Sequence, residues 1–325
     1  MLDLANLEAQ CRKVAPDNWL EYYWHVVQAN AKTDICAYLL WVHGKDIPVL
    51  ATLATSRHAR VWEQLYSRHL QTLIMCPPEH GKTAFQRAYT EWWLGTQTEA
   101  HWEGEDVPVP SCLLVMNAAT QAEEQCMVIA ATLETNERYR ALFPHVEPDV
   151  KWGWTKSVLF LKRRTPRPDP SFMATGIFGP IQGKRFGMRG VDDPTDQEDA
   201  LTGDTVKKQI ARHQGVLDDR MLAGAPKRDI LTPWSRIGIH SVLKDSPQWK
   251  SVTMPAIGYW GEGQALWPEV FPLERLAEKR QEKQLVEGSD LWQLAWMVNP
   301  VSAEGNMFQR AWLQYQSSPL EPLAA

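Results

Sequence analysis

The sequence lacks several features that would place it in a specialised class of protein. Its five cysteines form no C-x-x-C pair, and their odd number, with no signal peptide at the start, leads us to expect a reducing compartment. No apolar run approaches the roughly 18 residues of a membrane-spanning helix. Positive charge is not in excess, since the net charge is −5. A uniform basic face for duplex DNA is therefore excluded, and any contact with nucleic acid must come from local patches.

The composition is that of an ordinary globular protein. The chain has 325 residues, of which 44% are hydrophobic and 22% charged. This length is enough for one large domain or two, with a core that needs no disulfides. Tryptophan is frequent, with 16 residues spread along the chain. We interpret these tryptophans as fillers of the core and of interfaces, because large aromatic side chains bury the most apolar area.

The most informative stretch is an apolar run that leads to a glycine-lysine-threonine sequence. Leu73–Cys76 is short enough to be a buried strand, and Pro77-Pro78 ends it, because proline cannot continue a central strand. Gly81-Lys82-Thr83 then opens a segment, residues 84–94, that is typical of a helix. Gly95 follows and is expected to end this helix.

A strand, a tight loop and a helix in this order form the setting of a phosphate-binding loop. Backbone N–H groups of the loop and the helix N-terminus create an anion site. In such a loop Lys82 reaches the β- and γ-phosphates of a nucleotide, and the Thr83 hydroxyl ligates Mg²⁺. The usual pattern has a glycine at the position of Cys76. An ordinary strand-to-helix turn is therefore the alternative interpretation.

Two adjacent carboxylates, Asp192 and Asp193, follow a short segment that we expect to be a strand. Neighbouring carboxylates repel each other unless a cation or a proton offsets the charge. Mg²⁺ bound with ATP is the expected cation, because it prefers oxygen ligands. A turn at the start of a helix is the alternative, since Pro194 comes next.

Strands alternate with helices along the chain, which predicts a mostly parallel α/β sheet. Thr232 ends one of these strands, as either a turn residue or a sensor of a nucleotide on the next strand. Ligands of such sheets lie beyond the carboxyl ends of the strands. This geometry would bring Lys82, Asp192 and Thr232 together.

Two further features each have a functional and a plain interpretation. His58 and Arg60 precede the first strand, and they are either contacts to a nucleotide base or surface residues of a helix. Lys162–Pro168 is the densest basic run, and it is either a contact to a phosphate backbone or a solvated loop.

Taken together, these stretches resemble the ATPase domain of the large terminase subunit, the motor that pumps DNA into the procapsids of tailed bacteriophages. Pro77–Thr83 is similar to that family's Walker A motif. Gln182–Arg185 followed by Val191–Pro194 is similar to its Walker B neighbourhood, and Leu231–Trp234 resembles its coupling motif. Further segments follow in the family's order: Met254–Ile257, Leu266–Glu269, Asn299-Pro300 and Glu304–Trp312. The resemblance covers about residues 58 to 316.

The resemblance implies an α/β fold, a P-loop NTPase with a mostly parallel central sheet flanked by helices. It divides the chain into an N-terminal helical segment (1–57), an ATPase core (58–254), a small lid (255–316) and a flexible tail (317–325). The family's nuclease domain would begin after about residue 316. We therefore expect no nuclease activity from this chain, which would be an isolated motor fragment or would need a separate nuclease.

The resemblance also assigns roles to single residues. The ATP-binding residues would be those of the loop: Pro78, Glu79, His80, Gly81, Lys82 and Thr83. Thr83 and Asp192 would hold Mg²⁺, and Asp193 would orient the attacking water, with Glu198 as the other candidate for this catalytic acid. Thr232 would couple hydrolysis to movement.

The loop departs from the family at Glu79, where an arginine is usual, and the coupling motif departs at Pro233, again in place of arginine. Either another arginine compensates for Glu79 or turnover is slow. Ring motors also take an arginine from a neighbouring subunit. The candidates for that residue are Arg138, Arg140, Arg163 and Arg185.

The partners that the resemblance implies are double-stranded DNA, the portal protein and the small terminase subunit. The chain would form a homo-oligomeric ring on the procapsid and would act in the host cytoplasm, docked transiently at the portal, without a membrane. Two other functions stay open. One is a different P-loop DNA motor such as a helicase, and the other is a nucleotide-binding protein with weakened catalysis.

Overall fold

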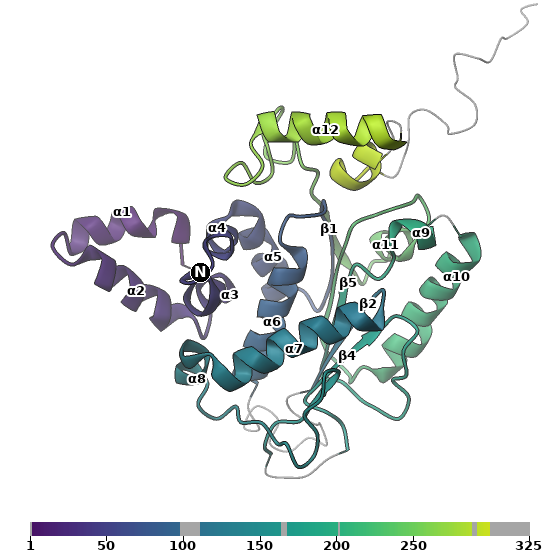
Figure 1. Cartoon of the computed structure of the whole chain (residues 1–325), viewed down its shortest axis with the longest axis horizontal. Coiled ribbons are helices and arrows are strands. Elements are labelled where there is room, and N and C mark those ends of the chain that lie inside the picture. Colours follow the sequence, from purple (N-terminus) through teal and green to yellow (C-terminus); the bar gives the residue numbers. More distant parts are fainter. Residues whose placement is uncertain (1, 98–110, 164–167, 201, 288–290, 300–325) are drawn as a thin grey trace, which may run out of the picture.

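The structure is a computed structural model, and it describes residues 2–97, 111–163, 168–200, 202–287 and 291–299. The chain before the first strand is helical, as predicted. Its elements are α1 (Leu4–Val14), α2 (Trp19–Asn30), α3 (Ile35–Leu39), the π-helix η1 (Leu40–Gly44), α4 (Pro48–Thr55) and α5 (Arg57–Arg68). The first two helices form a hairpin that extends to one side of the molecule (Figure 1).

Seven strands form one sheet in the spatial order β3-β4-β2-β5-β6-β1-β7. The strands are β1 (Gln71–Met75), β2 (Cys112–Met116), β3 (Val158–Leu159), β4 (Phe172–Gly176), β5 (Met188–Asp192), β6 (Lys227–Leu231) and β7 (Lys250–Thr253). Neighbouring strands pair in parallel except β3, which is antiparallel to β4. The predicted α/β fold with a mostly parallel central sheet is confirmed.

Helices cover both faces of this sheet. The elements between and after the strands are α6 (Lys82–Thr96), α7 (Ala119–Thr135), α8 (Glu137–Leu142), α9 (Gln197–Ala200), α10 (Gly203–Arg212), η3 (His213–Leu217), η4 (Asp218–Arg220) and α11 (Ile239–Lys244). Helices α5, α6 and α7 lie on one side of the sheet, and α10 and α11 lie on the other (Figure 1).

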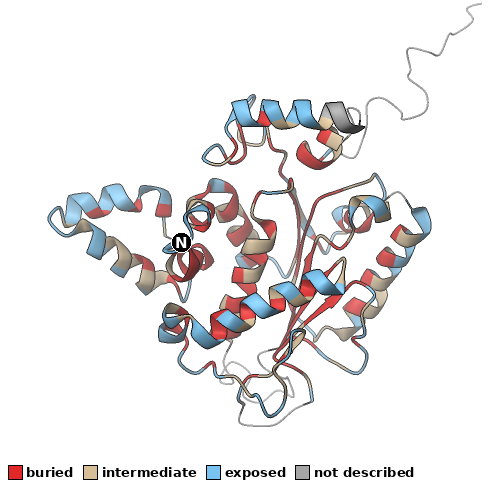
Figure 2. Ribbon diagram, in the orientation of Figure 1, coloured by how far each residue is buried: buried red, intermediate tan, exposed pale blue. Residues whose placement is uncertain are grey.

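The core lies along the central strands, where buried residues follow one another without a break (Figure 2). All five residues of β2 and of β5 are buried. Parallel strands covered on both faces are usually continuous apolar runs, and β2 has such a sequence. Strand β5 departs from this rule with Arg189, Gly190 and Asp192. Charged residues in a fully covered strand need a specific partner or a function.

One local prediction is wrong, because Gly95 does not end the helix that follows Gly81-Lys82-Thr83. Helix α6 continues to Thr96 and Gly95 is buried within it. A Cβ atom at this position would lie 2.4 Å from Cδ2 of Phe143. The glycine is therefore required by tertiary packing, since only a residue without a side chain lets Phe143 approach the helix.

The chain after β7 forms a separate layer, residues 255–299, which we call the lid. Its helix α12 (Leu273–Glu287) lies across the carboxyl end of the sheet, above α5 and β1, and the π-helix η5 (Trp292–Trp296) follows (Figure 1). The predicted remainder of the lid and the tail, residues 300–325, are outside the described residues. Within the described ranges, no helix combines the length and apolarity that crossing a membrane requires.

Candidate functional site

The loop between β1 and α6 contains two residues with a left-handed backbone, of which only one is a glycine. Glu79 and Gly81 both have positive φ values, 62° and 82°, and Gly81 caps the N-terminus of α6. A Cβ atom on Gly81 would also lie 2.7 Å from a methyl carbon of Leu53, in α4. Glycine is therefore needed here both for its φ and for the space. The predicted strand-loop-helix order is confirmed.

Lys82 lies at the centre of this loop. Its side chain is buried, and its ammonium donates to the carbonyl oxygens of Cys76 (3.2 Å) and Pro77 (2.9 Å) and to Oγ1 of Thr232 (2.7 Å). Nζ also lies 3.5 Å from Oδ2 of Asp193. An ammonium has three donors. A phosphate at this site would therefore have to replace at least one of the present acceptors.

Asp192, the last residue of β5, is buried beside α6. The Thr83 side chain hydrogen-bonds its carboxyl group, while Oδ1 is buried and has no hydrogen-bond partner in the part of the chain that the structure describes. Burial raises the pKa of Asp192 to about 7, and the charge of Asp193 acts in the same direction. A buried carboxylate with a free lone pair beside a hydroxyl is suited to a cation that takes oxygen ligands.

Asp193 and Thr232 connect β5 with β6. Oδ1 of Asp193 accepts a hydrogen bond from the backbone N–H of Thr232 at 2.6 Å. The Thr232 hydroxyl accepts from Lys82 and donates to the carbonyl oxygen of Cys76 at 3.2 Å. Thr232 therefore contacts the loop lysine, the loop backbone and the second carboxylate. The predicted convergence of Lys82, the carboxylate pair and Thr232 is present in the structure.

A cleft of about 380 Å³ opens beside Lys82, Thr83 and Asp193, and neither Asp192 nor Thr232 lines it. Its polar wall is made by the loop and by Asp193, and its apolar wall by α4 and the lid. The lining residues are Val49, Leu50, Leu53, Pro78, Glu79, Gly81, Lys82, Thr83, Ala84, Asp193 and Trp267. Small-molecule sites combine an apolar wall with a few convergent polar groups in this way.

The oxygen set fits the magnesium ion that the sequence predicts. Thr83 offers a hydroxyl and Asp192 a carboxylate, and Oδ1 of Asp192 is an acceptor that no group of the described residues satisfies. Mg²⁺ prefers such oxygen ligands and keeps several waters when one or two protein groups hold it. The predicted roles of Thr83 and Asp192 are chemically consistent with this site and stay predictions.

The other predicted residues lie in different places. Glu198 is exposed on α9 and does not line the cleft, so its role stays a prediction. His80 is buried, and its Nδ1 lies 2.9 Å from the carbonyl oxygen of Pro78. His58 is buried as well, so its interpretation as a surface residue is wrong. Its Nε2 lies 3.3 Å from the carbonyl oxygen of His80. The rings of Trp62 and Trp267 pack edge-on against the His58 ring and hold it against the loop.

Three of the four arginines considered for a neighbouring site are bonded within the chain. Arg138 pairs with Asp46, and Arg163 and Arg185 donate to the carbonyl oxygens of Asp169 and Asp219. Residues 164–167 of the basic run are outside the described residues. Neither interpretation of that run is decided by the structure.

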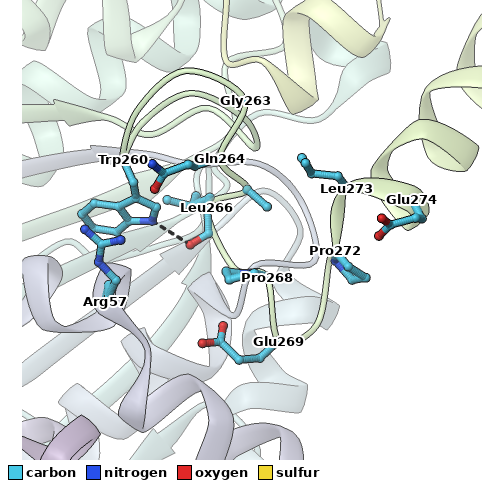
Figure 3. A pocket seen from close by; sticks show the side chains of 11 residues that line it. Arg57, Trp260, Gly263, Gln264, Leu266, Pro268, Glu269, Pro272, Leu273 and Glu274 are labelled. Carbon is cyan, nitrogen blue, oxygen red and sulfur yellow. Dashed lines mark hydrogen bonds between the residues drawn. The ribbon is translucent and has the colours of Figure 1, made fainter.

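A second hollow, of about 400 Å³, lies between the lid and the start of α5 (Figure 3). The Arg57 guanidinium stacks on the Trp260 ring, 4.1 Å from its centroid. The indole N–H of Trp260 donates to the carbonyl oxygen of Leu266 at 2.9 Å. This hollow contains none of the predicted site residues.

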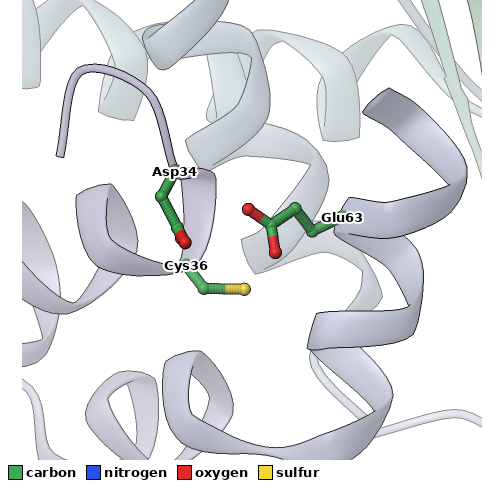
Figure 4. Close-up of side chains that lie close together, drawn as sticks. All are labelled: Asp34, Cys36 and Glu63. Atoms are coloured by element: carbon green, nitrogen blue, oxygen red, sulfur yellow. The ribbon is translucent and has the colours of Figure 1, made fainter. Parts of the chain in front are cut away.

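A third group brings Asp34, Cys36 and Glu63 together in the N-terminal helices (Figure 4). These residue types can ligate metals, but a cation is already present between them. Nη1 of Arg60 donates to Oδ2 of Asp34 at 2.8 Å and also pairs with Glu63. The cluster is therefore an internal ion-pair network that includes Arg60. The interpretation of Arg60 as a contact to a nucleotide base stays a prediction.

Comparison with known proteins gives structural similarity only. No protein-family model matches the chain, and no curated protein is significantly similar in sequence. Among solved structures, the chain is similar to the large terminase ATPase domain of Thermus phage P74-26. For an arginine variant of that domain the TM-score is 0.47 with 15% identity, covering 77% of this chain and 97% of that one. For the domain without this mutation the values are 0.45, 14%, 79% and 98%. Similarity at this level carries no argument about function, which rests on the geometry of the loop.

Proposed function

We propose that this chain is an ATP hydrolase that uses Mg²⁺, with its active site in the cleft above Lys82. The observation that carries the proposal is the convergence at one edge of the sheet. Lys82 and Thr83 begin α6, the Asp192–Asp193 pair lies at the end of β5, and Thr232 follows β6. These groups come from three separate elements, yet Lys82 directly contacts Asp193 and Thr232. Phosphoryl transfer depends mainly on positioning and charge stabilisation, so these few groups are sufficient in kind.

Each residue has a definite part in this proposal. The Lys82 ammonium moves its N–H donors from the loop carbonyl oxygens to the β- and γ-phosphates. Thr83 and Asp192 would hold Mg²⁺, which when bound neutralises charge on the phosphates. Asp193 orients the attacking water, because its carboxylate lines the cleft, is one-third exposed and lies 3.5 Å from the Lys82 ammonium. Thr232 relays a change at the phosphates to β6. Its hydroxyl accepts a hydrogen bond from Lys82, and its backbone N–H donates one to Asp193.

We further propose that hydrolysis drives a motor, the ATPase domain of a terminase large subunit that moves double-stranded DNA into a procapsid. Support comes from the ordered set of sequence motifs around this cleft and from the lid that covers it. Portal protein, small terminase subunit and a ring of identical subunits are the partners in this proposal. The place of action is the host cytoplasm, at the portal.

The test is ATP hydrolysis by the wild type and by Lys82→Ala, with and without linear duplex DNA. We expect Lys82→Ala to lower the rate by about 100-fold or more, because the lysine stabilises phosphate charge. Lys207→Ala, which removes an exposed lysine of α10, is the control and should retain the wild-type rate. Equal rates for wild type and Lys82→Ala would exclude the proposed hydrolase.

Nucleotide binding without turnover, even with DNA, would favour the alternative of a binding protein with weakened catalysis. Glu79 is the observation that favours this alternative, because it brings a carboxylate to the phosphate site. Strand separation without movement on duplex DNA would favour a helicase.

A further inference from the structure

The lid brings a lysine to the one loop residue whose charge opposes phosphate binding. Glu79 lines the cleft together with Lys82, Thr83 and Asp193, and its side chain is 51% exposed. Nζ of Lys279, in α12, lies 3.7 Å from Oε1 of Glu79 and 3.8 Å from Oε2 of Glu282. Lys279 is only 27% exposed, so the pair lies at the contact between loop and lid.

The neighbouring loop residue fixes the lid in this position. The His80 ring stacks on Phe271, with centroids 4.8 Å apart and planes inclined by 14°, and Trp296 lies edge-on at 5.9 Å. Burial lowers the pKa of His80 to about 4, so the ring is neutral at pH 7 and belongs to an apolar contact. Phe271 lies two residues before Leu273, the first residue of α12. The stacking therefore sets the distance from the loop to Lys279.

We infer that Lys279 is a positioning residue of the triphosphate site, and that it acts by neutralising Glu79. This inference rests on the proposed function. A free carboxylate beside the cleft would repel a triphosphate, and the lid supplies the compensating charge only when it lies against the loop. Binding of nucleotide and closure of the lid are then coupled. Because such coupling is reciprocal, a bound triphosphate holds the lid down.

The inference also explains why the loop contains a glutamate where a cation is usual in similar loops. The cation is Lys279, which belongs to the lid and follows Glu79 by about 200 residues in the sequence. A cation placed in the loop itself is always at the site. A cation on the lid is at the site only in the closed state, so lid position controls the affinity.

The experiment measures the dissociation constant of a fluorescent ATP analogue with Mg²⁺ for four proteins: wild type, Lys279→Ala, Glu79→Gln and the double variant. At about 0.05 M salt we expect Lys279→Ala to weaken binding on the order of tenfold, and at about 1 M salt much less, because salt screens partly exposed charges. Glu79→Gln should bind at least as well as the wild type. The double variant should equal Glu79→Gln, since no carboxylate is left to neutralise.

Two controls separate positioning from a general loss of structure. Lys279→Arg keeps the charge and should keep the affinity, and Arg280→Ala removes an exposed charge from the same helix and should change nothing. A lid that was merely loosened by Lys279→Ala would not be repaired by Glu79→Gln. Hydrogen exchange of residues 273–287 should slow on nucleotide binding in the wild type and not in Lys279→Ala.

Three results would overturn the inference. Unchanged affinity in Lys279→Ala at low salt is the first. An equal loss in the Glu79→Gln background is the second, because Lys279 would then act on the nucleotide without Glu79. The third is the absence of nucleotide binding by both the wild type and its Lys82→Ala variant. That result would overturn the proposed function as well. Nucleotide binding by the wild type without the Glu79 dependence would refute the inference alone.

Discussion

Two groups of buried charge lie on opposite faces of the same strands, β5 and β6, and they differ in how far they are paired. On the face toward η3, Arg189 donates to Asp218 (2.5 Å) and lies 3.3 and 3.4 Å from the oxygens of Asp229. Nε2 of His213 lies 2.5 Å from Oδ2 of Asp229. On the face toward α6, the Asp192 carboxyl has a buried oxygen without a partner. Alternation along β5 separates Arg189 from Asp192, since side chains three residues apart point to opposite faces.

The pKa values of Asp229 and Asp192 are shifted in opposite directions, in line with this difference in pairing. Burial alone would raise the pKa of Asp229, but Arg189 and His213 hold it below its ordinary value. Burial raises the pKa of Asp192 to about 7, and the partial opposition from Thr83, Lys82 and Arg87 does not reverse the change. A paired buried charge belongs to the architecture, whereas an unpaired carboxylate at a strand end marks a place for a ligand.

Removing a partner from the paired group should give the largest effect on stability. Arg189→Met leaves Asp229 and Asp218 without their arginine, and we expect a loss of about 3–5 kcal/mol in the free energy of unfolding at pH 8. The loss should shrink at lower pH, because His213, no longer opposed by Arg189, can take a proton beside Asp229. Urea denaturation at pH 6 and pH 8 measures both values. Arg185→Met, at an exposed arginine, is the control and should change stability by about 0.5 kcal/mol or less.

Removing the charge of Asp192 should raise the free energy of unfolding, whereas removing Arg189 lowers it. The pKa of Asp192 is about 7 in the folded protein and 3.8 ordinarily, so the folded state binds more protons between these values. Its contribution to stability is therefore fully present below pH 4 and is lost as the pH rises toward 7. Asp192→Asn should stabilise the protein without Mg²⁺ or nucleotide at pH 8, by up to about 4 kcal/mol, and should have no effect near pH 4.

Thermal or urea unfolding of Asp192→Asn and wild type across this pH range checks the prediction. Addition of Mg²⁺ and ATP should stabilise the wild type and not the variant, because the carboxylate is lost. Parallel stability curves for the two proteins from pH 4 to pH 8 would contradict the view that Asp192 is an uncompensated charge.

The smallest effect concerns the residue that joins the loop to β6. Thr232→Val keeps the shape of the side chain but removes the hydroxyl that contacts Lys82 and Cys76. We expect a loss of about 1 kcal/mol in stability, with nucleotide binding retained and turnover reduced. Thr232→Ser keeps the hydroxyl and is the matched control. Identical turnover in the Ser and Val variants would show that the hydroxyl has no part in hydrolysis.

The sequence was sufficient for the local features of the fold and of the loop. Apolar runs, prolines and glycines predicted the strand, the loop and the helix around Lys82, because strand length and turn chemistry are local properties. Asp192 was expected at a strand end and lies at the end of β5. The rule that parallel strands bring their carboxyl ends to one edge predicted the convergence of Lys82, Asp192 and Thr232. In the structure Lys82 contacts Thr232 and Asp193, the residue after Asp192.

Other features could not be predicted, because they depend on contacts between distant segments. Gly95 has the local appearance of a helix stop, yet Phe143 requires it inside α6. His58 follows a helix start and has a polar side chain, yet Trp62 and Trp267 bury it. No local signal links Lys279 to Glu79, since the pair forms only when the lid packs on the loop.

By itself, therefore, the sequence determined the mostly parallel α/β sheet, the strand-loop-helix order around Lys82 and the identity of the groups at the edge of the sheet. These follow from apolar periodicity and turn residues, which act over short distances, and from the rule that the carboxyl ends of parallel strands meet at one edge. Only the tertiary structure decided which carboxylate is left unpaired, which histidines are buried and which lysine reaches the loop. Burial and the distance between charges set these properties, and both are defined only after distant parts of the chain have packed together.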